Sequence, residues 1–204
     1  MILIVHTLTA GDLGIGTDLC SRYVWRGTDF GNTPAIQPWI SFSHGPVELG
    51  AWSSWSVTGA PGGNENDLYI SFSFSNFSFA LTDYFFPAYT GNDMIDDFGE
   101  TGAHIIELSG NFELDRFSFL AAVNVLGNDT ENSAYFEAGY NFYSNEEISA
   151  TMVAGLGNNI YTIDGDFNAV NIGVNVSKER YSAAYIINPD QKTSFLVLSL
   201  SLFN

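Results

Sequence analysis

Apolar and polar residues alternate with a period of two along most of this chain, and no other feature limits its possible folds as strongly. In residues 14–27, one set of alternate positions is mainly apolar and the other carries small or charged residues. Successive side chains of a β-strand point to opposite faces, so this pattern predicts a strand between an apolar and a polar environment. The segment reaches Tyr23 and Trp25 just before a polar loop, as membrane-spanning strands end in interfacial aromatic residues. We therefore expect residues 14–27 to form one membrane-spanning strand.

The same alternation recurs through the sequence, most clearly at residues 67–75 and 196–202. Counting the repeats predicts about twelve antiparallel strands. Short turns such as Ser75-Asn76 alternate with longer polar loops such as residues 87–102. Outer-membrane barrels have this arrangement, with the short turns on the periplasmic side. We expect an all-β fold: a single closed, up-and-down, transmembrane β-barrel over residues 11–204, with both termini periplasmic.

The composition separates this fold from its alternatives. Charged residues make up only 14% of the chain, against roughly 25% in soluble globular proteins. The net charge of −17 excludes a nucleic-acid-binding role, and the 46% hydrophobic content excludes a disordered acidic chain. A soluble β-sandwich also alternates, but here Ser, Gly, Asn and Thr dominate the second face in place of Lys and Glu. The membrane barrel is therefore favoured, and in lipid it must close so that every backbone group is paired.

The N-terminal residues 1–10, MILIVHTLTA, are apolar but lack a basic segment. We interpret them as the remnant of the apolar core of a signal peptide, and an ordinary N-terminal strand is the alternative. No apolar run in the sequence approaches the roughly 18 residues of a membrane-spanning helix.

Charged and aromatic side chains are expected inside the barrel. Arg22 and Arg26 are four residues apart and so share the inner face of the first strand. We expect them to face Glu107 and Glu137 across the lumen, because these carboxylates would otherwise repel each other there. The group would be either a structural ion-pair network or a charged constriction. The full predicted lumen set is Arg22, Arg26, Glu48, Glu107, Glu137, Trp39, Trp52, Tyr69 and Tyr135.

Two further sets of residues are predicted on the outer surfaces. Aromatic residues of a lipid-facing girdle are Tyr23, Trp25, Trp55, Phe42, Phe117, Phe142 and Tyr181. Acidic residues of the outer loops are Asp93, Asp96, Asp97, Glu100, Asp164 and Asp166. An acidic mouth attracts cations and repels anions. One residue conflicts with the pattern: Asp83 has lipid-facing parity, so either its strand has reached the headgroups or a bulge turns it inward.

No catalytic, metal or cofactor site is predicted. The acidic loop at residues 93–100 lacks the regular ligand spacing of a calcium loop. Cys20 is the single cysteine, which excludes an intramolecular disulfide and a multi-cysteine metal site. The three histidines do not stand near a nucleophile at a recognisable spacing, and neither GxSxG nor HExxH occurs.

Several segments together resemble the TorF-like porins, especially relatives from Bacteroidetes-type bacteria. They are SRYVWRGTDFGNTPAIQP (21–38), DLYISF (67–72), LTDYFFP (81–87), NIGVNVSKE (171–179) and INPDQKTSFLVLSLS (187–201). Residues 23–27 are the most specific part of the resemblance, which extends over nearly the whole chain. It implies a Gram-negative outer-membrane barrel with a signal peptide and a porin function, and it supplies no catalytic residues.

These observations predict a narrow, passive, cation-preferring channel in the outer membrane. The expected partners are outer-membrane lipid, small polar or cationic solutes and the barrel-assembly machinery. A non-conducting structural or surface-interaction barrel is the alternative, and a soluble ligand-binding β-protein is a weaker one.

Overall fold

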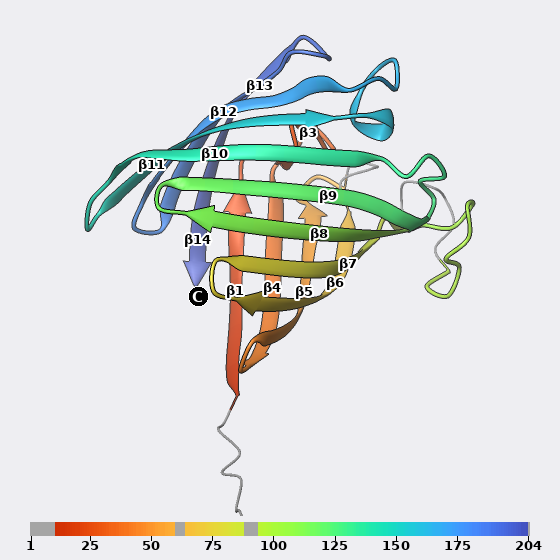
Figure 1. Cartoon of the computed structure of the whole chain (residues 1–204), viewed down its shortest axis with the longest axis horizontal. Helices are drawn as coiled ribbons and strands as arrows, with labels where there is room; N and C mark the ends of the chain where they lie inside the picture. Colours follow the sequence, from red (N-terminus) through yellow and green to blue (C-terminus); the bar gives the residue numbers. More distant parts are fainter. Residues whose placement is uncertain (1–10, 60–63, 88–93, 204) are drawn as a thin grey trace, which may run out of the picture.

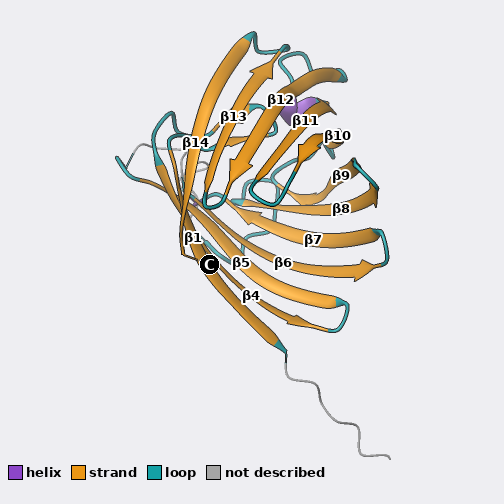
Figure 2. Cartoon of the chain, turned by 90° about the vertical axis from the view of Figure 1, so that its left-hand side faces the viewer, coloured by secondary structure: helices purple, strands orange, loops and turns teal. Residues whose placement is uncertain are grey.

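The computed structural model, which describes residues 11–59, 64–87 and 94–203, is a closed antiparallel β-barrel (Figure 1). Its strand order is β1-β14-β13-β12-β11-β10-β9-β8-β7-β6-β5-β4, which makes twelve strands. Consecutive barrel strands are neighbours, and β1 closes the barrel by pairing with both β4 and β14 (Figure 2). The prediction of a twelve-stranded, up-and-down, all-β barrel is confirmed.

The wall consists of strands of similar length. They are β1 (Asp12–Cys20), β4 (Ala35–His44), β5 (Val47–Ser56), β6 (Glu65–Phe74), β7 (Phe77–Phe85), β8 (His104–Leu114), β9 (Phe117–Gly127), β10 (Ala134–Ser144), β11 (Ile148–Gly157), β12 (Asn168–Lys178), β13 (Tyr181–Asn188) and β14 (Thr193–Phe203). Two short strands, β2 (Val24–Trp25) and β3 (Thr28–Asp29), form a separate sheet, and the 3-10 helix η1 covers Asn159–Tyr161. Short turns connect the strands at one end of the barrel, called here the short-turn end, and longer segments connect them at the other, the loop end.

The outer face of the barrel is apolar and exposed, and the buried side chains lie inside. Every barrel strand carries exposed large apolar residues, such as Leu13, Leu68 and Leu196 with 71%, 62% and 64% of their surface accessible. The residues between them point inward and are mostly small or polar. This arrangement is the inverse of a soluble β-sandwich, whose apolar faces pack against each other.

Large aromatic rings on the inner face lie over glycines of neighbouring strands. A Cβ atom added at each of these glycines would come within 2.7 Å of a ring atom. The ring–glycine pairs are Trp39 with Gly16, Tyr69 with Gly50, and Tyr135 with Gly155. The missing side chain provides the space that each ring occupies, which is one use of glycine inside a strand.

The prediction of one strand over residues 14–27 is wrong for its second half, because β1 ends at Cys20 and residues 21–34 leave the wall. These residues fold back as the β2–β3 hairpin, in which Trp25 pairs with Thr28. Arg26 and Gly27 form the tight turn between the two strands, with φ of 49° and 81°. Two residues with positive φ are characteristic of a hairpin turn of type I′. The alternation that suggested a continuous strand persists because the hairpin strands are extended as well.

The turn glycine fixes the position of the hairpin, and replacing it tests that role. A Cβ atom at Gly27 would stand 1.9 Å from the carbonyl oxygen of Val170, whereas one at Gly59 (φ 67°) meets nothing within 4 Å. Gly27→Ala and Gly59→Ala share the strain of a positive φ, and only the first adds a clash of about 1–3 kcal/mol. We expect tryptic cleavage after Arg22, measured by mass spectrometry, to be roughly tenfold faster in Gly27→Ala. Wild-type rates in both variants would show that the contact with Val170 does not hold the hairpin.

Candidate functional site

The β2–β3 hairpin lies inside the barrel at the loop end, near the end of β1 and the start of β4 (Figure 1). Its aromatic residues pack against inward-facing residues of distant wall elements. Tyr23 lies 5.5 Å from Trp52 of β5, and Trp25 lies 5.2 Å from Tyr84 of β7 and 6.0 Å from Tyr161 of η1, measured between ring centroids. The hairpin therefore crosses the lumen from one wall to the other.

A buried ion pair attaches the tip of the hairpin to the wall. Nη1 of Arg26 donates to Oε2 of Glu107 at 2.5 Å, and Nη2 donates to Oε1 at 3.0 Å. Their side chains are only 7% and 2% exposed. Nη1 also donates to the hydroxyl of Tyr161 at 2.6 Å, and the hydroxyl of Tyr84 donates to Oε1 of Glu107 at 3.1 Å. Two parallel charge-assisted hydrogen bonds of this kind are strong and directional.

Aromatic rings enclose the same guanidinium group. Its central carbon lies 4.2 Å from the ring centroid of Trp25, 4.5 Å from that of Tyr135 and 5.5 Å from that of Tyr161. Burial raises the pKa of Tyr161 to about 12, so this hydroxyl is neutral at physiological pH. Cation–π contacts strengthen when the cation has lost its water, as it has here.

The backbone of the hairpin tip also rests on the wall. Nδ2 of Asn188 in β13 donates to the carbonyl oxygen of Gly27 at 3.2 Å. In β12 the register with β11 shifts, so that Asn171 and Ala169 have partners and Val170 between them has none. Val170 is fully buried under the hairpin turn. A β-bulge at this position thus turns one residue of the wall toward the hairpin.

Arg22 does not reach the predicted carboxylates. It pairs with Asp29 within the hairpin at 2.5 Å, and its side chain is 33% exposed. An exposed pair like this contributes at most about 1 kcal/mol. Glu137 is bound by neutral groups instead, since it accepts hydrogen bonds from Tyr135 at 2.5 Å and from Asn171 at 2.9 Å. Of the four charges predicted to meet, the structure brings only Arg26 and Glu107 together.

Two buried acids of β6, Glu65 and Asp67, were missing from the predicted lumen set. They are 2% and 7% exposed, and neither forms an ion pair with a Lys or Arg among the described residues. Tyr23 hydrogen bonds to Glu65, and burial together with this carboxylate raises the pKa of Tyr23. The alternation of Glu65, Asp67 and Tyr69 contains the signal for their inward direction.

The remaining predicted lumen residues line the inner wall below or beside the hairpin. Glu48 accepts hydrogen bonds from Tyr69 and Ser43, both at 2.8 Å, toward the short-turn end. At that end the inward-facing Asn111 and Asn175 are exposed, whereas inward-facing residues at the loop end are buried or half-buried. The hairpin therefore fills the loop end of the lumen, and solvent reaches the inner wall at the short-turn end.

The predicted aromatic girdle is wrong for its first two members. Tyr23 and Trp25 lie inside the barrel, because the chain leaves the wall after Cys20. The other members lie on the outer face, all with at least 40% of their surface exposed: Trp55, Phe42, Phe117, Phe142 and Tyr181. Trp55 stands toward the loop end of β5, and the other four are near the short-turn end of their strands.

Asp83 keeps its outward direction, and no bulge interrupts the pairing of β7. It lies at the loop end, where its Oδ1 is 2.7 Å from Nδ1 of His104 on β8. The ring of His104 is stacked between those of Phe85 and Phe98, at 4.5 Å and 4.1 Å. Of the two alternatives for Asp83, the inward turn through a bulge is therefore excluded, and a histidine from the next strand partners this outward carboxylate.

Several predicted outer-loop acids stabilise the loops themselves. Oδ1 of Asp97 accepts a hydrogen bond from the backbone of Gly99 at 2.9 Å, and Oδ1 of Asp164 accepts one from Asp166 at 3.1 Å. Asp96 and Glu100 are exposed, and Asp93 lies outside the described residues. Within the part of the chain that the structure describes, no group of three or more His, Cys, Asp or Glu side chains could hold a metal ion.

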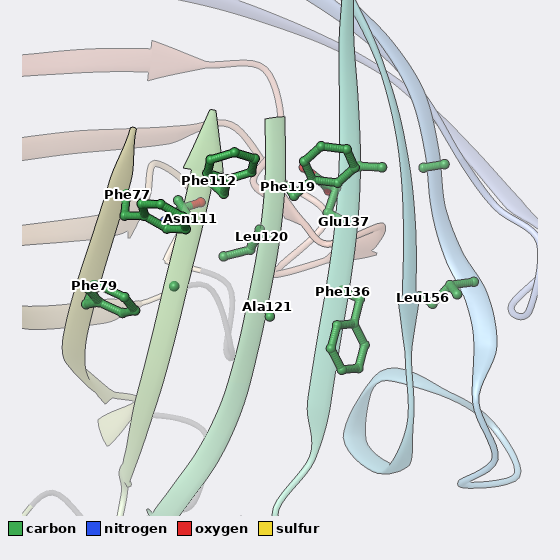
Figure 3. Close-up of a pocket in the computed structure, with 13 residues that line it drawn as sticks. Phe77, Phe79, Asn111, Phe112, Phe119, Leu120, Ala121, Phe136, Glu137 and Leu156 are labelled. Carbon is green, nitrogen blue, oxygen red and sulfur yellow. The ribbon is translucent and has the colours of Figure 1, made fainter. Parts of the chain in front are cut away.

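A groove of about 510 Å³ lies on the outer face over β7 to β11 (Figure 3). Phenylalanine rings such as Phe79 and Phe136 border it, and small residues such as Gly110, Ala121 and Ala154 form its floor. It belongs to the apolar exterior and is separate from the hairpin site.

Removing the counter-charge of Arg26 should release the hairpin. Glu107→Gln leaves a buried guanidinium unpaired, which costs about 3–5 kcal/mol. We expect tryptic cleavage after Arg22 to accelerate by at least about 100-fold, since each 1.4 kcal/mol is tenfold. The matched control is Glu137→Gln, whose carboxylate binds no arginine, and it should behave as wild type. Equal cleavage in the two variants would exclude the ion pair as the attachment.

Comparisons with known proteins give one result over most of the chain. A family model described as "Bacterial protein of unknown function (Gcw_chp)" matches residues 6–197. No curated protein matches the chain. Among the described residues, no helix is both long enough and apolar enough to cross a membrane.

Proposed function

The chain belongs to the Gcw_chp family of bacterial proteins of unknown function, and we propose that it is an outer-membrane β-barrel whose hairpin closes a narrow, passive, cation-preferring channel for small solutes. The observation that carries this proposal is the buried Arg26–Glu107 pair, which attaches a separate hairpin to the inner wall of a closed barrel. The resemblance to TorF-like porins, most specific at residues 23–27, is part of the same proposal.

The surface of the barrel supports a membrane location. Exposed large apolar residues occur on every barrel strand, and burying that surface in lipid removes it from water at roughly 25 cal/mol per Å². Aromatic residues stand toward both ends of the outer face, as in the girdles of outer-membrane barrels. In a Gram-negative cell the short-turn end, where both termini of the barrel domain lie, would face the periplasm. The barrel-assembly machinery would then insert the chain.

The same surface argues against a soluble ligand-binding protein. Such a protein rarely exposes a contiguous apolar patch of more than a few hundred Å². Here the exposed apolar residues surround the whole barrel.

The charges in the lumen support a preference for cations. Both arginines near the lumen belong to the hairpin, and each is already paired with a carboxylate. The inner wall supplies the carboxylates of Glu48, Glu65, Asp67, Glu107 and Glu137. When the hairpin moves out it removes its arginines, and a lumen lined by carboxylates attracts cations.

A non-conducting structural or surface-interaction barrel is the second candidate. The close contact of Gly27 with Val170 and the bulge that presents Val170 favour it, because a permanently seated hairpin would use both. Conduction by variants without a seated hairpin distinguishes the two candidates.

The membrane location predicts two properties of the expressed protein. It should fractionate with outer membranes and require detergent for extraction. Its electrophoretic mobility should change on heating, because a closed barrel stays folded in cold sodium dodecyl sulfate. Recovery in the soluble fraction without detergent would refute the membrane proposal.

Planar-bilayer recording tests the hairpin as the closing element. Wild-type protein should be closed for most of the time, whereas a variant with residues 22–32 replaced by a short Gly-Ser linker should conduct continuously. The reversal potential of this variant in a KCl gradient should have the sign of a cation-preferring pore. Glu107→Gln should open more often than wild type, and Glu137→Gln should not. If this linker variant inserts into the bilayer and never conducts, the non-conducting alternative is established.

A further inference from the structure

The wall of the barrel contains a binding site that the hairpin itself occupies. Three residues outside the hairpin contact the Arg26 guanidinium, namely Glu107 of β8, Tyr135 of β10 and Tyr161 of the loop helix η1, and Tyr84 of β7 holds Glu107. None of them belongs to the hairpin, so they remain with the barrel when the hairpin leaves. We propose that these residues form a receptor site for guanidinium-bearing solutes, in which Arg26 acts as a tethered occupant.

The hydrogen-bond geometry of the site selects a planar fork over a point charge. Both terminal nitrogens of Arg26 donate to the two oxygens of Glu107, at 2.5 Å and 3.0 Å. Among amino-acid side chains, only the guanidinium of arginine presents two parallel N–H donors at this spacing, whereas an ammonium group offers a single compact charge. Tyr84 holds the receiving carboxylate with a hydrogen bond of 3.1 Å, so the acceptor is oriented by the wall and not by the ligand.

The rings of the site select a flat cation as well. Tyr135 lies 4.5 Å from the guanidinium carbon and Tyr161 lies 5.5 Å from it. Tyr161 also accepts a hydrogen bond from Nη1 at 2.6 Å. An arginine-like solute can make all these contacts, since its guanidinium reproduces the end of the Arg26 side chain. The hairpin and such a solute would compete, which would make Arg26 an autoinhibitory contact.

The use of this site in permeation rests on the proposed function, but binding can be measured without conduction. The probe is methylguanidinium chloride, titrated calorimetrically into purified protein in detergent, with methylammonium chloride at equal concentration as the comparison. Arg26→Ala empties the site and should bind methylguanidinium with a Kd on the order of millimolar. Wild type and Arg22→Ala should give no binding heat, because Arg26 still fills the site in both.

Two further variants keep the test decisive. The barrel with residues 22–32 replaced by a linker also has an empty site, so it serves if Arg26→Ala does not fold. The double variant Arg26→Ala/Glu107→Gln keeps the space but lacks the carboxylate, and it should lose binding by at least about tenfold. Equal affinity for methylguanidinium and methylammonium, or equal binding by Arg26→Ala and Arg22→Ala, would overturn the proposal.

Planar-bilayer recording distinguishes the failure of this inference from the failure of the proposed function. Methylguanidinium should reduce the current through the barrel in which a linker replaces residues 22–32. Methylammonium at the same concentrations should leave that current unchanged. Binding to Arg26→Ala by a protein that never conducts would support the receptor site and refute the channel. Conduction without selective binding of methylguanidinium and without block by it would support the channel and refute the receptor site.

Discussion

The structure at the loop end of this barrel depends on how the guanidinium of Arg26 is stabilised after burial has removed its hydration water. A buried, unpaired guanidinium costs several kcal/mol, so its site must supply both charge and hydrogen bonds. Glu107 supplies the charge and Tyr161 an additional acceptor, while Trp25 and Tyr135 cover the faces of the group. These partners come from the hairpin, two strands and a loop helix, so one side chain connects segments that lie 81 and 135 residues from it in sequence.

The two faces of the wall meet different physical demands. The outer face carries exposed apolar side chains, and lipid would cover them. The inner face carries polar groups, and at the loop end these find partners mainly in the hairpin and in each other. The hairpin is thus the inner counterpart of the lipid: each covers one face of the same strands.

The sequence predicted the barrel well, because the direction of side chains in a strand is a local property that repeats along the chain. It could not show that residues 21–34 leave the wall, since Tyr23 and Trp25 keep the same alternation in the hairpin as in a strand. The Arg26–Glu107 pair was within reach, because few arginines are available to balance the inward glutamates. Tyr161 was not, because it lies in a polar loop whose path into the lumen depends on contacts between distant segments.

The aromatic rings that lie over glycines restrict how this family can change. At Gly16, Gly50 and Gly155 a side chain cannot be added while the ring above it remains. A mutation to a larger residue costs least after the neighbouring ring has moved or become smaller, so the order of the two steps matters. We therefore expect each ring and its glycine to be inherited together among relatives, as linked pairs of positions on adjacent strands.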